Sequence, residues 1–205
     1  MYVPAHFEEK DAAVLFDLIA GHPFGTLVTH GADGLDANHI PFELDRERNV
    51  LLAHVARANP VWQAVRDGDA VLAIFQAGDA YISPNWYPSK HEAHKQVPTW
   101  NYRVVHVHGR ITIQDDEKAV RAIVAKLTRT HEASQPVPWK MSDSPRDFIE
   151  SMVEKIVGLE IEITRLVGKV KLGQNKEERD RLGAANALKE NGAGEIADAM
   201  LAVRK

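Results

Sequence analysis

The spacing of apolar side chains along this chain changes from helical to extended within the first 25 residues. Apolar residues fall on one helical face from about Asp11 to Ala20, and Gly21 ends that helix. The apolar residues then come in short, β-rich runs separated by the turn sequences GADG, DRERN and DGD. These runs cover residues 25–30, 35–44, 50–55 and 70–76, with a short helix expected between residues 59 and 65. The pattern predicts a series of antiparallel strands.

The second half of the chain begins with strands and then becomes mostly helical. Residues 81–83 and 102–114 are typical of strands; in the second, Val105, Val107 and Gly109 face one way and His106, His108 and Arg110 the other. Helices are expected after Asp116, after Pro145, over 176–189 and over 195–203, and a last strand over 159–167. The helix after Pro145 is predicted to bury Phe148, Ile149, Met152, Val153 and Ile156. Antiparallel strands with peripheral helices predict an α+β barrel.

Composition narrows the possible functions. The chain has 25 basic and 29 acidic residues and a net charge of −4, so it lacks the overall basic character of most nucleic-acid binders. DNA contact would need a local patch. Because there is no cysteine, disulfides and thiolate metal sites are excluded. No apolar run approaches the ~20 residues of a membrane-spanning helix, so we expect a soluble, cytoplasmic protein with no membrane partner.

Residues 80–102 form an unusual window. They contain three Tyr, two Trp, three Pro, two His and two Lys, although aromatic residues are only 7% of the chain. Flat rings beside hydroxyl, amide and ammonium groups, on a backbone stiffened by proline, suit a planar ligand that also carries an anion. Packing of the rings over a core is the alternative, but the polar groups alternate with the rings too closely for packing alone.

A second candidate site lies where a strand ends and a helix begins, in the sequence HVARANP (54–60). Arg57 and backbone N–H groups there are able to converge on a phosphate. Alternatively, Asn59 only caps the helix and Arg57 is exposed; the spacing does not decide between the two. Upstream, Asn38 and His39 precede Pro41, which removes a ladder donor and predicts an edge strand.

Three other patterns have less specific readings. Lys169 and Lys171 share one strand face and are either solvated or directed at a ligand. His91 and His94 do not have the HExxH spacing of a zinc site, so no metal is predicted. The last two helices have a helix-turn-helix outline, but their balanced charge favours a packed or dimer-contacting tail.

The chain also carries a set of longer motifs in a particular order. They are MYVPAHF, ANHIPF, HVARANP, AYISPNWYPSK, VPTWNY, LTRTHE with a following PW, IVGLEIEI and GKVKLGQN. This series resembles the PaiB-type FMN-binding negative transcriptional regulators, over nearly the whole chain to about Leu188. The resemblance implies an antiparallel split barrel like that of the pyridoxamine-phosphate-oxidase-like flavoproteins, and a homodimer with FMN at the subunit interface. It implies an FMN-binding domain over 1–175 and a helical C-terminal extension over 176–205.

The resemblance also assigns site residues, carried over motif by motif. His54, Arg57 and Asn59 are expected at the flavin phosphate, with Asn38 and His39 beside the isoalloxazine ring. Ring-edge and stacking contacts are expected from Ser89, Lys90, Thr99, Trp100 and Asn101. Lys171, Gln174 and Asn175 are expected to approach from the same or the partner chain. The chain departs from the family pattern at Gly173, where serine is usual, and at Ala77, where glycine is usual. The ring cluster and the cationic corner are predicted to form two ends of one pocket.

Three functions remain open at this point. The first is a transcriptional repressor with structural or sensory FMN, acting on DNA directly or through a partner. The second is an FMN-dependent oxidoreductase of the pyridoxamine-phosphate-oxidase-like class, with Tyr81, His91 or His106 as proton donor. The third is a haem-binding or haem-degrading split-barrel protein, with His91 or His94 as iron ligand. The spacing selects no catalytic residue.

Overall fold

The computed structural model describes residues 1–203, and the chain forms two compact units. The first unit comprises Met1–Leu15, Gln76–Val105 and Val167–Lys205, and the second comprises Phe16–Phe75 and His106–Leu166. One boundary between the units falls inside a helix, Ala12–Gly21, and the other three fall inside the strands Ala70–Ile82, Thr99–Gln114 and Ile156–Lys171.

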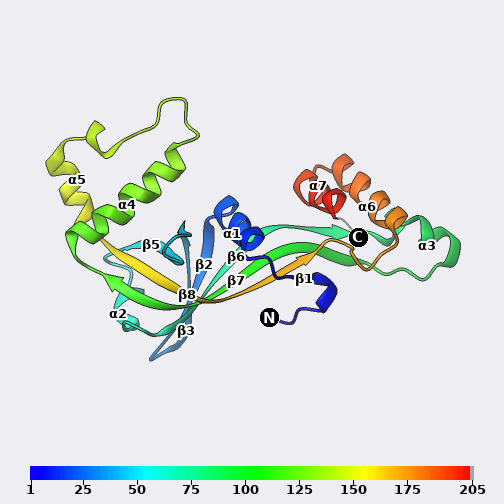
Figure 1. Ribbon diagram of the computed structural model, residues 1–205, viewed down its shortest axis with the longest axis horizontal. Coiled ribbons are helices and arrows are strands. Elements are labelled where there is room, and N and C mark those ends of the chain that lie inside the picture. Colours follow the sequence, from blue (N-terminus) through cyan, green and yellow to red (C-terminus); the bar gives the residue numbers. More distant parts are fainter. Residues whose placement is uncertain (204–205) are drawn as a thin grey trace. The chain divides into compact units, whose positions relative to one another are not determined.

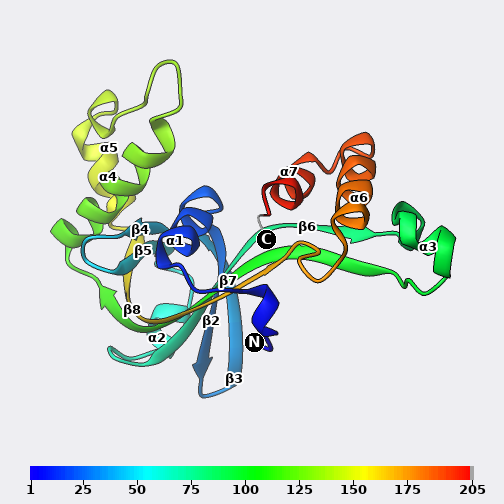
Figure 2. The same ribbon diagram turned by 45° about the vertical axis from the view of Figure 1, so that its right-hand side comes forward.

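The described residues contain one eight-stranded sheet with the path β3-β2-β6-β7-β8-β5-β4, and β1 pairs with β8. The strands are β1 (Glu8–Glu9), β2 (Phe24–Gly31), β3 (Gly34–Pro41), β4 (Glu43–Asp45), β5 (Val50–Ala56), β6 (Ala70–Ile82), β7 (Thr99–Gln114) and β8 (Ile156–Lys171). The β2–β3 hairpin and the β4–β5 and β5–β8 pairs are antiparallel. β3 ends the path, which confirms the predicted edge strand, and Figure 2 shows the β2–β3 hairpin that it closes. These strands confirm the predicted antiparallel α+β class.

The helices of the described chain lie mostly where periodicity predicts them. They are α1 (Ala12–Gly21), α2 (Val61–Ala64), α3 (Pro88–Ala93), α4 (Glu117–Glu132), α5 (Arg146–Val153), α6 (Glu178–Glu190) and α7 (Gly194–Ala202). Short 3-10 turns cover Ala5–Phe7, Pro84–Trp86 and Met141–Asp143. The periodicity does not predict α3; it begins with Pro88 in its first turn and ends at His94, whose φ is 53°.

The middle of β7 alternates as predicted. Val105, Val107 and Gly109 are buried, whereas His106 and His108 are half-buried. Gly109 is required because a Cβ there would lie 2.3 Å from Ile161 Cγ2 and 2.6 Å from the Glu162 carbonyl oxygen. At this position β7 therefore meets the residues of β8 too closely for any side chain.

The predicted buried face of α5 is only partly right. Ile149 and Val153 are buried beneath α4, but Phe148 is 51% exposed and Met152 is 37% exposed. Ile156 belongs to β8 rather than to the helix. The helix ends at Val153, which is why Ile156 is not part of its face. Of the four remaining positions, only Ile149 and Val153 face the core that α5 shares with α4.

In the first unit, α6 and α7 pack on one another and on the outer part of β6 (Figure 1). The shared core includes Ile82 and Leu172 from strand and turn, and Ala184, Leu188 and Met200 from the two helices. This confirms the predicted packed tail. Of the predicted extension over 176–205, the last two residues lie outside the described part of the chain. Among the described residues, no helix is long and apolar enough to cross a membrane.

Candidate flavin site

Of the site residues predicted from the sequence, five lie in the second unit and the others in the first, and each group is described by itself. In the second unit, Asn59 occupies the corner between β5 and α2. Its side-chain oxygen accepts from the Val61 amide at 3.0 Å, and its Nδ2 donates to Asn38 Oδ1 at 2.7 Å. Asn59 therefore closes a turn at the start of α2 and joins that turn to the edge strand β3.

Arg57, at the same corner, is held by the second unit's own acceptors. Its guanidinium makes two bonds to the Asp115 carboxylate, at 2.6 and 3.2 Å, and donates to the Glu154 carbonyl at 2.7 Å and to the Ile156 carbonyl at 3.2 Å. The carboxylate raises the pKa of Arg57, and the guanidinium lowers the pKa of Asp115. A phosphate arriving here would have to share the guanidinium with Asp115 or displace it.

His54 has a different character, because its Nδ1 is buried without a hydrogen-bond partner. Among the described residues it is the single buried side-chain nitrogen or oxygen in that condition. Burial also lowers the pKa of His54 below its usual 6.5, so the ring is neutral at about pH 7. A buried polar atom without a partner costs free energy, and a bound molecule that supplies a donor or acceptor would recover it.

Two further features of the second unit are His39 and a surface hollow at Pro60. His39 lies on the edge strand with its Nδ1 2.9 Å from Thr26 Oγ1. Beside the corner, at Pro60, is an open hollow of about 650 Å³. Its lining includes His30, Arg66 and Asp69, so both charge signs are present. Within the second unit, the corner thus combines a half-buried imidazole, paired amides and a guanidinium.

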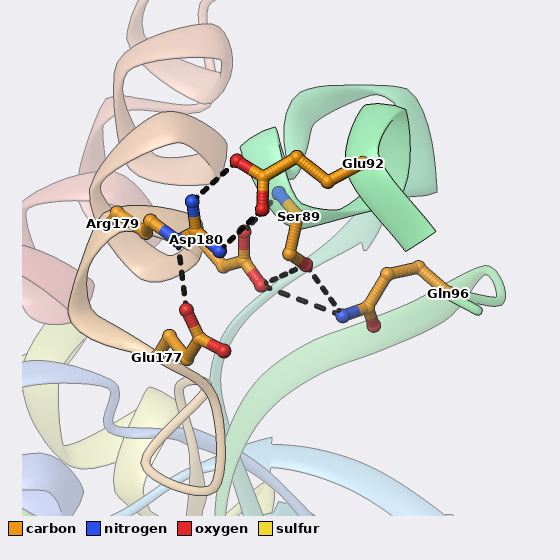
Figure 3. A network of polar contacts seen from close by, with 6 residues as sticks. All are labelled: Ser89, Glu92, Gln96, Glu177, Arg179 and Asp180. Atoms are coloured by element: carbon orange, nitrogen blue, oxygen red, sulfur yellow. Dashed lines mark hydrogen bonds and ion pairs between the residues drawn. The ribbon is translucent and has the colours of Figure 1, made fainter. Parts of the chain in front are cut away.

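In the first unit, Ser89 is part of a network that fastens α3 to α6 (Figure 3). Asp180, only 1% exposed, accepts from the Ser89 amide at 3.0 Å and from Ser89 Oγ at 2.6 Å. Gln96 Nε2 donates to Ser89 Oγ at 2.8 Å, and on the surface Arg179 forms a two-bond pair with Glu92 at 2.5 and 2.8 Å. Ser89 therefore has internal partners for its polar groups. Sequence reasoning missed Asp180, because nothing in the sequence around it marks it as the one carboxylate that is buried among residues 1–203.

The predicted residues at the start of β7 point in different directions. Asn101 is 2% exposed, and its Nδ2 donates to Met200 Sδ of α7 at 3.3 Å. Trp100 is 54% exposed and meets Tyr81 edge-on, with ring centroids 5.9 Å apart. Thr99 Oγ1 lies 2.5 Å from Lys171 Nζ. Asn101 thus serves the packing of α7, whereas Trp100 and Thr99 are available to a ligand.

The remaining predicted residues surround the turn after β8. Gln174 bridges its own turn, accepting from the Leu172 amide at 2.7 Å and donating to the Val170 carbonyl at 2.6 Å. Gly173 has a φ of +84°, which favours glycine, so the departure from the family's serine fits this backbone. Asn175 is exposed and Lys90 is half-buried in α3.

The two candidate haem ligands lie in the last turn of α3 and at the residue that follows it. His91 Nε2 lies 3.2 Å from the Asn85 carbonyl oxygen, and His94 ends the helix in a left-handed conformation. In the described part of the chain, no group of three or more His, Cys, Asp or Glu side chains is arranged to hold a metal ion.

Comparison with known families tests the resemblance that the sequence motifs carry. Residues 1–165 match the family described as "Putative FMN-binding domain". The chain belongs to this FMN-binding family. The match confirms the resemblance carried by the sequence motifs.

Relatives of this FMN-binding family member occur in bacteria and fungi. The chain is 30% identical over 191 residues to the protease synthase and sporulation protein PAI 2 of Bacillus subtilis, covering 92% of this chain and 89% of that protein. It is 35% identical over 159 residues to the protein YKL070W of Saccharomyces cerevisiae, covering 66% of this chain and 93% of the yeast protein. The chain thus spans most of the length of both relatives.

Solved structures share the fold at much lower identity. The FAD and heme binding protein of Mycobacterium smegmatis superposes with a TM-score of 0.63 at 16% identity, over 86% of this chain and 79% of that one. The flavocytochrome Anf3 of Azotobacter vinelandii gives 0.61 at 13% identity, over 87% and 77%. This likeness confirms the split-barrel fold of the family member.

Asp180 gives a first prediction. Replacing Asp180 with Ala leaves the Ser89 amide and hydroxyl without their acceptor in a buried position, so we expect a loss of about 1–3 kcal/mol in the free energy of unfolding. Urea denaturation measures it. Glu178→Ala, on the exposed side of the same helix, is the matched control and should change stability little. Equal stability of the two variants would contradict the importance of the Ser89–Asp180 contact.

Burial of histidines gives a second prediction. Burial lowers the pKa of His54, His106 and His108 below 6.5. The folded state therefore binds these protons less tightly than the unfolded state, and stability present at neutral pH is lost as pH falls below about 6.5. We expect a lower melting temperature at about pH 5.5 than at about pH 7.5, and a smaller difference in His54→Leu. A wild-type melting temperature that stays level or rises on acidification would contradict the lowered pKa values of these histidines in the folded state.

Proposed function

We propose that this protein binds FMN, with the phosphate end at the corner formed by His54, Arg57 and Asn59. The family match over residues 1–165 is the observation that carries the proposal. The likeness to flavin-binding structures supports the fold it requires. Within the chain, the buried Nδ1 of His54 without a partner is what a site lacking its ligand would leave.

Each residue at the corner has a definite part in this proposal. The neutral His54 ring offers a donor or an acceptor without bringing a charge. The Asn59 amide holds the edge strand through Asn38 and keeps the corner in one geometry. Arg57 supplies the positive charge, already oriented by the carbonyls of Glu154 and Ile156. A preorganised guanidinium loses little conformational entropy when an anion binds.

When bound, FMN supplies an isoalloxazine ring able to accept one or two electrons. In our proposal, Asn38 and His39 lie along this ring on the edge strand. Ser89 and Asn101 have polar groups that are bonded inside the first unit, so we expect them to stabilise that unit rather than to touch a ligand.

A regulatory role is the second candidate, favoured by 30% identity to the sporulation protein PAI 2 over 92% of the chain. The tail helices do not suit direct reading of DNA. The segment α7 contains no Lys or Arg. In α6, Arg179 pairs with Glu92 and Glu177, Lys189 pairs with Asp198, and Arg181 is buried against the Met200 carbonyl. We therefore propose that any effect on transcription passes through a partner.

This reading of the tail predicts that the purified chain shows no sequence-specific DNA binding. Fluorescence anisotropy with promoter and scrambled duplexes, each at several stated salt concentrations, measures it. Tight binding confined to one sequence would contradict it. The rate of NADH or NADPH oxidation by the same preparation distinguishes a regulator from an oxidoreductase. An oxidoreductase of this class should consume one of the two over many turnovers.

The FMN proposal is tested by a pair of substitutions at one contact. Arg57→Ala and Asp115→Ala both remove the tie between the corner and Asp115, but only the first removes the positive charge. We expect Arg57→Ala to weaken FMN binding on the order of tenfold, as for a lost charged hydrogen bond. Asp115→Ala should bind FMN at least as tightly as the wild type, because it frees the guanidinium.

Quenching of flavin fluorescence gives both dissociation constants. If the two variants weaken FMN binding equally, Arg57 acts only by fixing the backbone. If neither changes it, the phosphate lies elsewhere.

A further inference from the structure

Three lysines of the first unit lie at or just after the end of β8, and none has an acidic partner in the part of the chain that the structure describes. Lys169 is 9% exposed, and its Nζ lies 3.2 Å from the Tyr2 carbonyl oxygen. Lys171 Nζ lies 2.5 Å from Thr99 Oγ1, and Lys176 Nζ lies 2.7 Å from Gln96 Oε1. Each ammonium thus has one neutral oxygen as its acceptor, although it has three N–H donors.

Aromatic rings enclose these ammonium groups. Lys169 Nζ is 5.2 Å from the centre of the Tyr102 ring and 5.8 Å from that of Tyr2. Lys171 Nζ is 5.9 Å from the Phe7 ring. The rings offer cation–π attraction and reduce contact with water. Burial consequently lowers the pKa of Lys171, and the charges of Lys169 and Lys176 lower it further, against an opposing effect of Tyr102.

The carboxylate opposite Lys169 in the sheet forms its ion pair with another residue. Glu8 stands opposite Lys169 in the β1–β8 pairing, yet its carboxylate pairs with Lys10 at 3.2 Å. Within residues 1–203, none of the three lysines forms an ion pair with an acidic side chain, whereas the exposed Arg179 has two. Half-buried charges of one sign, left without a counter-charge, are costly unless something else neutralises them.

We propose that Lys169, Lys171 and Thr99 form a binding site for a small oxyanion, a carboxylate or phosphate group. Thr99 accepts from Lys171, which leaves its own O–H free to donate to the anion. Lys169 and Lys171 are two residues apart on one strand, so both are able to reach one group from the same face. The site lies wholly in the first unit and does not depend on flavin at the Arg57 corner.

The test is isothermal titration of the full-length protein at constant ionic strength, with inorganic phosphate in one arm and benzoate in the other. We expect saturable binding of at least one anion, and the arm that saturates identifies the ligand class. Lys171→Gln should weaken that binding about tenfold, as when a charged hydrogen bond is lost. Lys171→Arg should retain it, which guards against a folding defect in the first variant.

The control is Lys95→Gln, which removes the same charge from an exposed lysine of the same unit. No saturable binding in either arm overturns the proposal, as does an equal effect of Lys171→Gln and Lys95→Gln. A third arm adds FMN. If phosphate or benzoate displaces FMN competitively, the lysines belong to the flavin's own site and a separate oxyanion site is disproved. Failure of FMN to bind leaves the two anion arms fully interpretable.

Discussion

The pairing of β5 with β8 is the constraint on which the candidate flavin corner depends. Its register runs from Val50 opposite Glu162 to Ala56 opposite Ile156. This ladder places His54 opposite Gly158 and brings the carbonyls of Glu154 and Ile156 within reach of the Arg57 guanidinium just beyond the strand end. A slip of one residue would turn His54 to the other face of the sheet and remove the corner.

The polar residues discussed above fall into two groups. Some have all the partners they need inside the protein, and others have a nitrogen or a charge that no group of residues 1–203 satisfies. Ser89, Asn101 and Asn59 have their hydrogen bonds inside the protein, and their removal would be felt as lost stability. Among the described residues, His54 Nδ1 has no hydrogen-bond partner, and Lys169 and Lys171 have no acidic partner. Because a buried group without a partner costs free energy, His54, Lys169 and Lys171 are the better guide to where a ligand binds.

Much of the fold was predictable from hydrophobic period, and the misses have local causes. Two separate strands were expected over residues 70–76 and 81–83, but the structure has one strand, β6, that continues to Ile82. Within it Gly78 adopts a φ of +80°, which glycine tolerates, so the strand passes through this irregular position without ending. The helix α3 escaped notice because prolines mark its surroundings as irregular, although Pro88 is well tolerated in a first turn.

The site was less predictable, because sequence spacing shows which residue types are near but not which partner each one takes. Nothing in the local sequence pairs Arg57 with Asp115, Ser89 with Asp180 or Asn101 with Met200, since these contacts join distant segments. The family motifs supplied what spacing lacked, namely that the corner and the aromatic window belong to an FMN-binding protein.

The central claim is that this chain holds FMN, and the visible spectrum of the purified full-length protein tests it most directly. The account predicts the two absorption bands of an oxidised flavin, with FMN released on denaturation in proportion to protein. A colourless preparation whose spectrum and fluorescence do not respond to added FMN would contradict it.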